Sequence, residues 1–240
     1  MLKGLVIGGK SIQDATGLGK TIMLLTIVYI ARYHETLDAQ GQRIYEITVL
    51  VVPASVIKQW VDEIFSRFPD FKLIISYDDT GLNSSVYEGS FVTSTAMKHY
   101  GSPEKWPERL RYIFDEKNPV TGMTILITSQ DTASRRFLVP YKVTVREAIS
   151  FKPRKLDATG NEIFREPKET WTEYTGILSG KVGIAVVDEA QRLKDNTSLR
   201  WKAYSQLAPR LSIILGATPM SNIGVVSKAK RKFVLGALPY

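Results

Sequence analysis

The sequence contains no cysteine and no long apolar run, and both absences narrow the classes of protein that it can encode. Without cysteine, disulfides and thiolate metal sites are excluded, and we expect a reducing compartment. The longest apolar run, residues 22–31, is about half the length of a membrane span. The opening residues, MLKGLVIGGK, are too short and too glycine-rich for a secretory signal. We therefore expect an intracellular protein that does not span a membrane.

Positive charge is in excess, and it is concentrated in two places. The formal net charge is +8. Residues 135–155 hold seven basic side chains against Glu147 alone, and the run KAKRK at 228–232 holds four more. A local excess of this kind favours a polyanionic partner, although a solvated loop and a basic tail would have the same composition. KAKRK also fits a nuclear-import signal, which predicts a nuclear location.

Short apolar runs recur along the chain and indicate the fold class. Because they are apolar almost continuously, they predict strands buried on both faces of a parallel sheet. These runs are residues 47–54, 71–77, 123–129, 183–190 and 211–217. Helical patterns lie between them, one following Ser55 as its expected N-cap and one at 103–114 with Pro107 near its start. We predict one α/β domain over residues 1–240, a doubly wound, mostly parallel sheet with helices on both faces.

Two parts of the chain do not follow this strand–helix alternation. Residues 132–182 combine the basic segment with polar, turn-rich sequence, and we predict an irregular, partly mobile insertion there. Residues 225–240 form a basic tail. The sequence leaves open whether GLVIGG or SIQD supplies the first strand.

The string DATGLGKT at residues 14–21 has the pattern of a phosphate-binding loop in which Asp14 replaces the first glycine. Gly17 and Gly19 would let backbone N–H groups approach phosphates at the start of the helix that follows. Lys20 would lie on the phosphates and Thr21 would ligate Mg²⁺. The predicted nucleotide-binding residues are Asp14, Ala15, Thr16, Gly17, Leu18, Gly19, Lys20, Thr21 and Ile22. The alternative is a glycine-rich turn before a buried helix.

The segment AVVDEAQ at 185–191 places two acidic residues after an apolar strand. Parallel sheets bind ligands at the carboxyl ends of their strands, so Asp188 is positioned to hold Mg²⁺ and Glu189 to polarise an attacking water. Lys20, Asp188 and Glu189 are the predicted catalytic residues. Two ordinary exposed acids at a strand end are the alternative.

Three further strands end in small or hydroxyl residues. VVPAS (51–55) and LITSQ (126–130) resemble the strand ends through which translocating ATPases contact nucleic-acid phosphates. LGATPMSN (215–222) ends in a hydroxyl that could link the nucleotide site to the nucleic-acid face. Each is equally explained by simple caps and turns.

Taken in this order, the segments DATGLGKT, VVPASVIKQW, ILITS, VVDEAQRLKD and LGATPMSN resemble the first RecA-like lobe of the Swi/Snf-type chromatin-remodelling ATPases, in helicase superfamily two. The resemblance runs from about residue 10 to about 224 and does not include the insertion. Aspartate is usual in this family at the position of Asp14. The family has histidine where this chain has Gln191, and Glu and Met where it has Ala15 and Thr16.

The resemblance implies ATP and Mg²⁺ as cofactors and DNA, in chromatin as nucleosomes, as the partner. It places Ser55, Lys58, Thr128 and Ser129 on the DNA side, and it assigns coupling of hydrolysis to DNA to Gln191, Gly216 and Thr218. The family's second RecA-like lobe, with its arginine finger, has no counterpart in these 240 residues. We therefore expect the chain alone to bind ATP but to hydrolyse it slowly. Another superfamily-two helicase lobe, or a non-catalytic DNA-binding fragment, are the alternatives.

Overall fold

The computed structural model describes the greater part of the chain, in several segments. They are residues 10–13, 19–31, 36–77, 90, 108–145, 158–159, 169–193, 195 and 197–216. At a few of these positions, Lys20 and Gly216 among them, the backbone alone is described. Asp14–Leu18, Pro107 and Thr218, and the tail at 225–240, lie outside the described residues.

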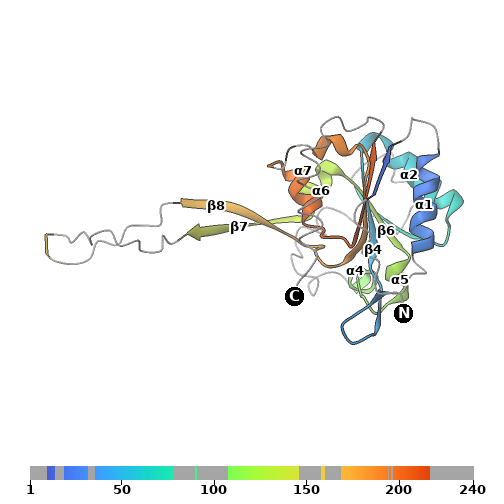
Figure 1. Cartoon of the computed structure of the whole chain (residues 1–240), viewed down its shortest axis with the longest axis horizontal. Coiled ribbons are helices and arrows are strands. Elements are labelled where there is room, and N and C mark those ends of the chain that lie inside the picture. Colours follow the sequence, from blue (N-terminus) through green and yellow to red (C-terminus); the bar gives the residue numbers. More distant parts are fainter. Residues whose placement is uncertain are drawn as a thin grey trace.

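The described elements alternate between strands and helices (Figure 1). In chain order they are β1 (Lys10–Gln13), α1 (Lys20–Ala31), β2 (Thr36–Leu37), β3 (Arg43–Ile44), β4 (Ile47–Val52), the 3-10 helix η1 (Ala54–Val56), α2 (Ile57–Arg67), β5 (Lys72–Ser76), α4 (Glu108–Ile113), α5 (Pro119–Gly122), β6 (Thr124–Ser129), α6 (Gln130–Arg136), β7 (Leu138–Val145), β8 (Glu169–Gly176), β9 (Val182–Val187), the 3-10 helix η5 (Ala190–Leu193), α7 (Leu199–Ser205) and β10 (Leu211–Gly216).

Six strands form one sheet in the order β1-β10-β9-β4-β6-β5, and every pairing in it is parallel. All six residues of β4 and all six of β6 are buried. Strands covered on both faces bury their side chains on either side, so apolar residues predominate in them and the runs do not alternate. The five strands expected from the sequence are confirmed, and the SIQ stretch supplies the strand that pairs with β10.

Helices cover both faces of this sheet, as the sequence predicts. One face packs against α1 and α2 through Leu24, Leu25, Trp60 and Val61. The other face packs against α4, α6 and α7. Figure 1 shows α1 and α2 on one side of the sheet and α6 and α7 on the other. The fold is therefore a doubly wound α/β domain.

Because the strands are parallel, their carboxyl ends lie at one edge of the sheet. The segments that follow β1, β4, β6, β9 and β10 all begin at this edge, which we call the carboxyl edge. All the motifs singled out in the sequence follow one of these strands. The topology thus collects residues that are far apart in the chain.

Ser55 is not the N-cap that the sequence predicted. The chain first makes the 3-10 turn η1, in which the Val56 N–H donates to the carbonyl of Pro53 at 3.1 Å. Val56 is the N-cap of α2, and no side chain caps the helix there. The extra turn after Pro53 moves the helix start two residues beyond Ser55.

The prediction of an irregular insertion at 132–182 was wrong for its described parts. Residues 130–136 form α6, and β7 and β8 pair as an antiparallel ribbon from Leu138↔Gly176 to Val145↔Glu169. Figure 1 shows this ribbon extending away from the sheet. Its base is anchored, because Leu138, Ile177 and Leu178 belong to the core and Lys202 lies 4.9 Å from the ring centre of Tyr174. Within the described segments, no helix has the length and apolar character that crossing a membrane requires.

Candidate functional site

The predicted phosphate loop runs into α1 at the carboxyl edge. Gly19 has φ +71°, a left-handed conformation that favours glycine, and a Cβ there would meet nothing within 4 Å. Its carbonyl accepts the N–H of Met23 at 3.0 Å, so the helix begins directly behind the glycine, with Lys20 as its first residue. Thr21 is half-buried and Ile22 is exposed. The strand–glycine–helix context that a phosphate loop needs is present.

Asp188 and Glu189 follow β9 at the same edge, two strands from β1. The Asp188 N–H donates to the carbonyl of Val51 at 2.9 Å, next to Val51↔Val187, the last pair of the β9–β4 ladder. Glu189 then turns away with φ +53°, a left-handed conformation that is costly for a residue with a side chain. Its N–H donates to the Asp188 carboxylate at 2.9 Å. The turn presents two half-buried carboxylates at the end of a buried strand.

Gln191, at the position where the family has histidine, contacts the second of these carboxylates. Its side-chain amide donates to the carboxylate of Glu189. The amide can therefore orient Glu189 through a hydrogen bond, although it cannot take up or release a proton at physiological pH as an imidazole can.

The LKD segment that follows DEAQ ends in a capping arrangement before α7. The Asp195 carboxylate accepts hydrogen bonds from the Thr197 hydroxyl at 2.6 Å and the Thr197 N–H at 2.8 Å. The bond from the Thr197 hydroxyl makes the largest contribution to lowering the pKa of Asp195, and the bond from the Thr197 N–H adds to it. The carboxylate is therefore ionised at neutral pH. The Ser198 hydroxyl accepts the Trp201 N–H at 3.2 Å and caps α7. The segment after the two carboxylates is thus tied to the start of a helix.

Of the two strand ends predicted to face DNA, the one after β4 has exposed polar side chains and the one at the end of β6 has buried hydroxyls. Ser55 and Lys58 are exposed, and Lys58 forms an ion pair with Asp62 at 2.7 Å. The Thr128 hydroxyl is buried and donates to the carbonyl of Ser76 at 2.8 Å. The Ser129 hydroxyl is also buried, accepts the N–H of Thr132 at 3.1 Å and caps α6.

β10 brings Gly216 to the carboxyl edge, where it pairs with Gln13 at the end of β1. The end of β10 is therefore next to the strand that leads into the phosphate loop. Thr218, the second residue expected to take part in coupling at this strand end, lies outside the described residues.

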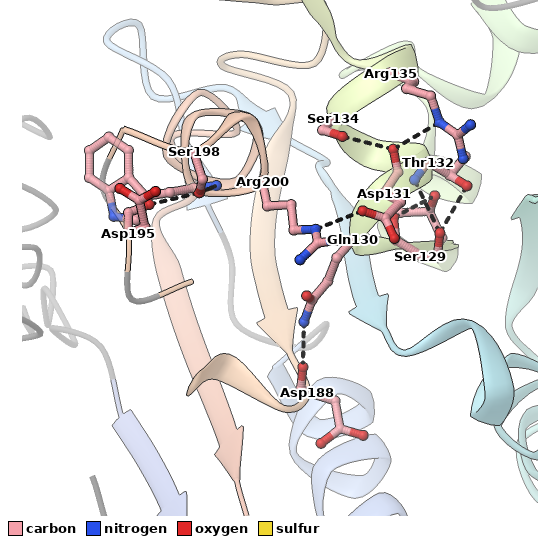
Figure 2. A network of polar contacts seen from close by, with 12 residues as sticks. Ser129, Gln130, Asp131, Thr132, Ser134, Arg135, Asp188, Asp195, Ser198 and Arg200 are labelled. Carbon is pink, nitrogen blue, oxygen red and sulfur yellow. Dashed lines mark hydrogen bonds and ion pairs between the residues drawn. The ribbon is translucent and has the colours of Figure 1, made fainter. Parts of the chain in front are cut away.

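The structure adds residues that the sequence analysis did not single out. Gln130, the first residue of α6, donates its side-chain amide to the carbonyl of Asp188 at 3.0 Å. Next to it, Asp131 forms an ion pair with Arg200 of α7 at 2.6 Å. Figure 2 shows Gln130 reaching the Asp188 carbonyl while the Asp188 carboxylate points away from it. Gln130 ends the LITSQ segment, but its contact crosses 58 residues of sequence, so spacing gives no signal of it.

The basic segment 135–155 is not uniformly a surface feature. Arg136 is only 5% exposed and donates to the hydroxyl of Ser76 at 3.0 Å. Arg135 and Lys142 are exposed, while the structure does not describe the segment beyond Val145. One of the charges counted toward a polyanion-binding surface is therefore used inside the protein.

Comparisons with known proteins identify the family of the chain. The model of the SNF2-related domain family matches residues 8–229. The chain is 26% identical over 211 residues to "Chromatin-remodeling ATPase INO80" of Arabidopsis thaliana, covering 88% of this chain and 10% of that protein. It is 26% identical over 213 residues to "Helicase SWR1" of Eremothecium gossypii, covering 88% of this chain and 9% of that protein. The chain thus spans about a tenth of the length of these curated relatives.

Among solved structures, the Sulfolobus solfataricus SWI2/SNF2 ATPase core in complex with dsDNA aligns with a TM-score of 0.46 and 16% identity, over 95% of this chain and 31% of that chain. The match to the family model covers nearly the whole chain and includes the segments 14–21, 51–55, 126–130, 185–195 and 215–222. The resemblance seen in the sequence is confirmed, and the chain belongs to the SNF2-related domain family.

Proposed function

We propose that this chain is the ATP-binding lobe of a DNA-dependent ATPase of the chromatin-remodelling type, one RecA-like lobe over residues 1–240. The observation that carries the proposal is the convergence at the carboxyl edge. The glycine turn that opens α1 and the Asp188–Glu189 turn, 169 positions apart in sequence, follow strands of the same sheet. Membership of the SNF2-related domain family and the names of the relatives support it.

The chain offers a consistent set of groups for Mg-ATP. Backbone N–H groups at the start of α1 and the Lys20 ammonium would hold the phosphates. The Thr21 hydroxyl and the Asp188 carboxylate are hard oxygen donors, which is the chemistry that Mg²⁺ prefers. The ion would neutralise phosphate charge, and Glu189, oriented by Gln191, would polarise the attacking water. Gln191, Gly216 and Thr218 would couple this step to DNA.

For DNA, we assign the exposed residues at the end of β4. Ser55 and Lys58 lie beyond this strand, and the Lys58–Asp62 pair is open to solvent, so a phosphate can compete for the ammonium. Thr128 and Ser129 would shape the neighbouring segment, because their hydroxyls are bonded inside the protein. The relatives' names favour nucleosomal DNA and a nuclear location, and KAKRK is consistent with import.

The arginine finger that this family implies belongs to a second lobe. Such a finger contributes about 10³–10⁵-fold to phosphoryl transfer. We therefore expect the 240-residue chain alone to bind ATP and to hydrolyse it slowly. Rapid, DNA-stimulated turnover by the purified chain would contradict this expectation.

Titration with a fluorescent ATP analogue in the presence of Mg²⁺ tests the nucleotide site. We expect Lys20→Ala to abolish saturable binding because it removes the charge that faces the phosphates. Lys58→Ala is the matched control, since it removes an exposed helical lysine at another strand end and should leave nucleotide affinity unchanged. Equal affinity of the Lys20→Ala variant and the unmodified chain would rule out the site.

A further inference from the structure

Gln130 connects two strand ends that are not neighbours in the sheet. It follows β6 directly, whereas Asp188 follows β9, and β4 lies between these strands. The side chain is 5% exposed and crosses the end of β4 to donate to the Asp188 carbonyl at 3.0 Å. The Asp188 N–H already donates to Val51 of β4. Both backbone polar groups of Asp188 are therefore fixed, one by β4 and one by Gln130.

The residue after this anchor, Glu189, has a strained backbone conformation. Glu189 has φ +53°, and a left-handed residue with a side chain persists only where its surroundings determine it. Its N–H donates to the carboxylate of Asp188, so the turn and the carboxylate are oriented together. Loss of the bond from Gln130 would remove one of the contacts that hold the start of this turn.

The oxygen of the Gln130 side-chain amide argues against a role that is only to fill space in the core. Its Oε1 atom is buried and accepts no hydrogen bond from any described residue. A buried acceptor without a donor is unfavourable, and native structures keep few of them. An apolar side chain of similar length would fill the space without this cost. The amide is therefore better explained by its contact with Asp188 than by packing.

The segment that carries Gln130 is itself firmly held. Ser129 caps α6, and Asp131 pairs with Arg200 of α7, so the residues on both sides of Gln130 have fixed partners (Figure 2). We propose that Gln130 is a positioning residue, which holds the Asp188–Glu189 turn from the end of β6 and so sets the geometry of the two carboxylates. This rests on the proposed function, in which those carboxylates serve Mg-ATP.

Hydrogen exchange of the full chain without ligands tests the contact directly. Gln130→Met keeps the length of the side chain and removes both amide atoms. We expect exchange in the peptide 186–193 to rise about fivefold, the effect of losing one typical hydrogen bond, with no change in β4. Gln59→Met is the matched control, because that exposed amide donates to Glu63 within its own helix, α2. Unchanged exchange at 186–193, or an equal rise across the sheet, would overturn the proposal.

Gln130→Glu separates a hydrogen bond from a space-filling role. A protonated carboxyl group can donate to the Asp188 carbonyl, but an ionised one cannot. We therefore expect the exchange rate at 186–193 in the variant to equal that of the unmodified chain at low pH and to exceed it at high pH. The charged neighbours Asp131, Asp188, Glu189 and Arg200 are the same in both chains. A ratio that does not change with pH would contradict the hydrogen bond.

A nucleotide titration measures the consequence for the site. Removing a partner that orients a metal ligand costs roughly tenfold in metal affinity. We expect Gln130→Met to lose about that factor in nucleotide affinity with Mg²⁺ and little without it. Equal losses under both conditions would contradict the positioning role. If the unmodified chain bound no nucleotide, the proposed function would fail, while the exchange measurements would still decide whether Gln130 holds the turn.

Discussion

The strands of the parallel sheet and those of the β7–β8 ribbon lie in opposite environments. Every residue of β6 is buried between two layers of helices, whereas Tyr141 and Trp171 on the ribbon are 45% and 41% exposed. The sheet is stabilised by apolar burial on both faces. The ribbon, beyond its anchored base, depends on its ladder and on cross-strand contacts, since an isolated pair of strands is marginally stable in water. Stability in this molecule is therefore unevenly distributed.

The largest expected effect is in the sheet. Ile127→Ala removes a fully buried side chain from β6, and such truncations cost about 2–5 kcal/mol. Val143→Ala, at a half-buried position on the ribbon, should cost less than about 1 kcal/mol. Urea unfolding of both variants measures the difference. Similar losses for the two would mean that the ribbon belongs to the same cooperative core.

A smaller effect is expected at α6, which links the sheet to the ribbon. Ser129→Ala removes the hydroxyl that caps this helix, and losses of such caps cost about 1 kcal/mol. Ser134→Ala in the same helix removes a hydroxyl that donates to the carbonyl of Asp131 and caps nothing, so its cost should be near zero. Urea denaturation of the two variants measures their free energies of unfolding and so separates the contribution of the cap from that of any other serine hydroxyl in α6. If Ser134→Ala lowered the free energy of unfolding as much as Ser129→Ala, the loss could not be attributed to the helix cap.

The smallest effect concerns the exposed face of the ribbon. The Trp171 indole and the Tyr141 hydroxyl both donate to the Glu173 carboxylate, at 2.9 and 2.8 Å, and these bonds lower the pKa of Glu173 from its usual 4.5. A lowered carboxyl pKa contributes stability above the ordinary pKa that is lost as pH falls through the lowered value. The ribbon should therefore loosen only below about pH 4.5.

Tyr141→Phe removes one of these two bonds and should move that loosening to higher pH. The Trp171 indole N–H resonance, followed during an acid titration, reports it directly. Tyr112→Phe alters an exposed tyrosine outside the ribbon and should leave the titration unchanged. An indole resonance that titrates identically in the Tyr141→Phe variant would show that the hydroxyl does not stabilise the carboxylate.

The same difference in environment decides what the sequence could predict. The buried strands were visible in the sequence, because apolar residues predominate in a strand covered on both faces. ITVLVV in β4 is apolar except for Thr48, and TILITS in β6 has an apolar centre, Ile125 to Ile127, flanked by buried hydroxyl residues. The ribbon has mixed sequence, and its strands are separated by 23 residues, so neither alternation nor a short turn marked it as a pair. It was therefore predicted as irregular.

The site divides in the same way. Motifs with fixed spacing within the chain, such as GLGKT and VVDEA, were visible because their chemistry is local. The contact of Gln130 with Asp188 and the pair Asp131–Arg200 join segments 58 and 69 residues apart, and only the sheet order brings them together. The burial of Arg136 was hidden for the same reason, since its partner Ser76 lies at the end of β5, 60 residues earlier in the chain.

The central claim is that the glycine turn before α1 and the Asp188–Glu189 turn form one nucleotide site at the carboxyl edge. Hydrogen exchange of the full chain, with and without a non-hydrolysable ATP analogue and Mg²⁺, tests it most directly. We predict that the nucleotide slows exchange in peptides 14–23 and 186–193 together and leaves the ribbon strands 138–145 and 169–176 unchanged. Protection of only one of the two turns, or of the ribbon in their place, would contradict the account.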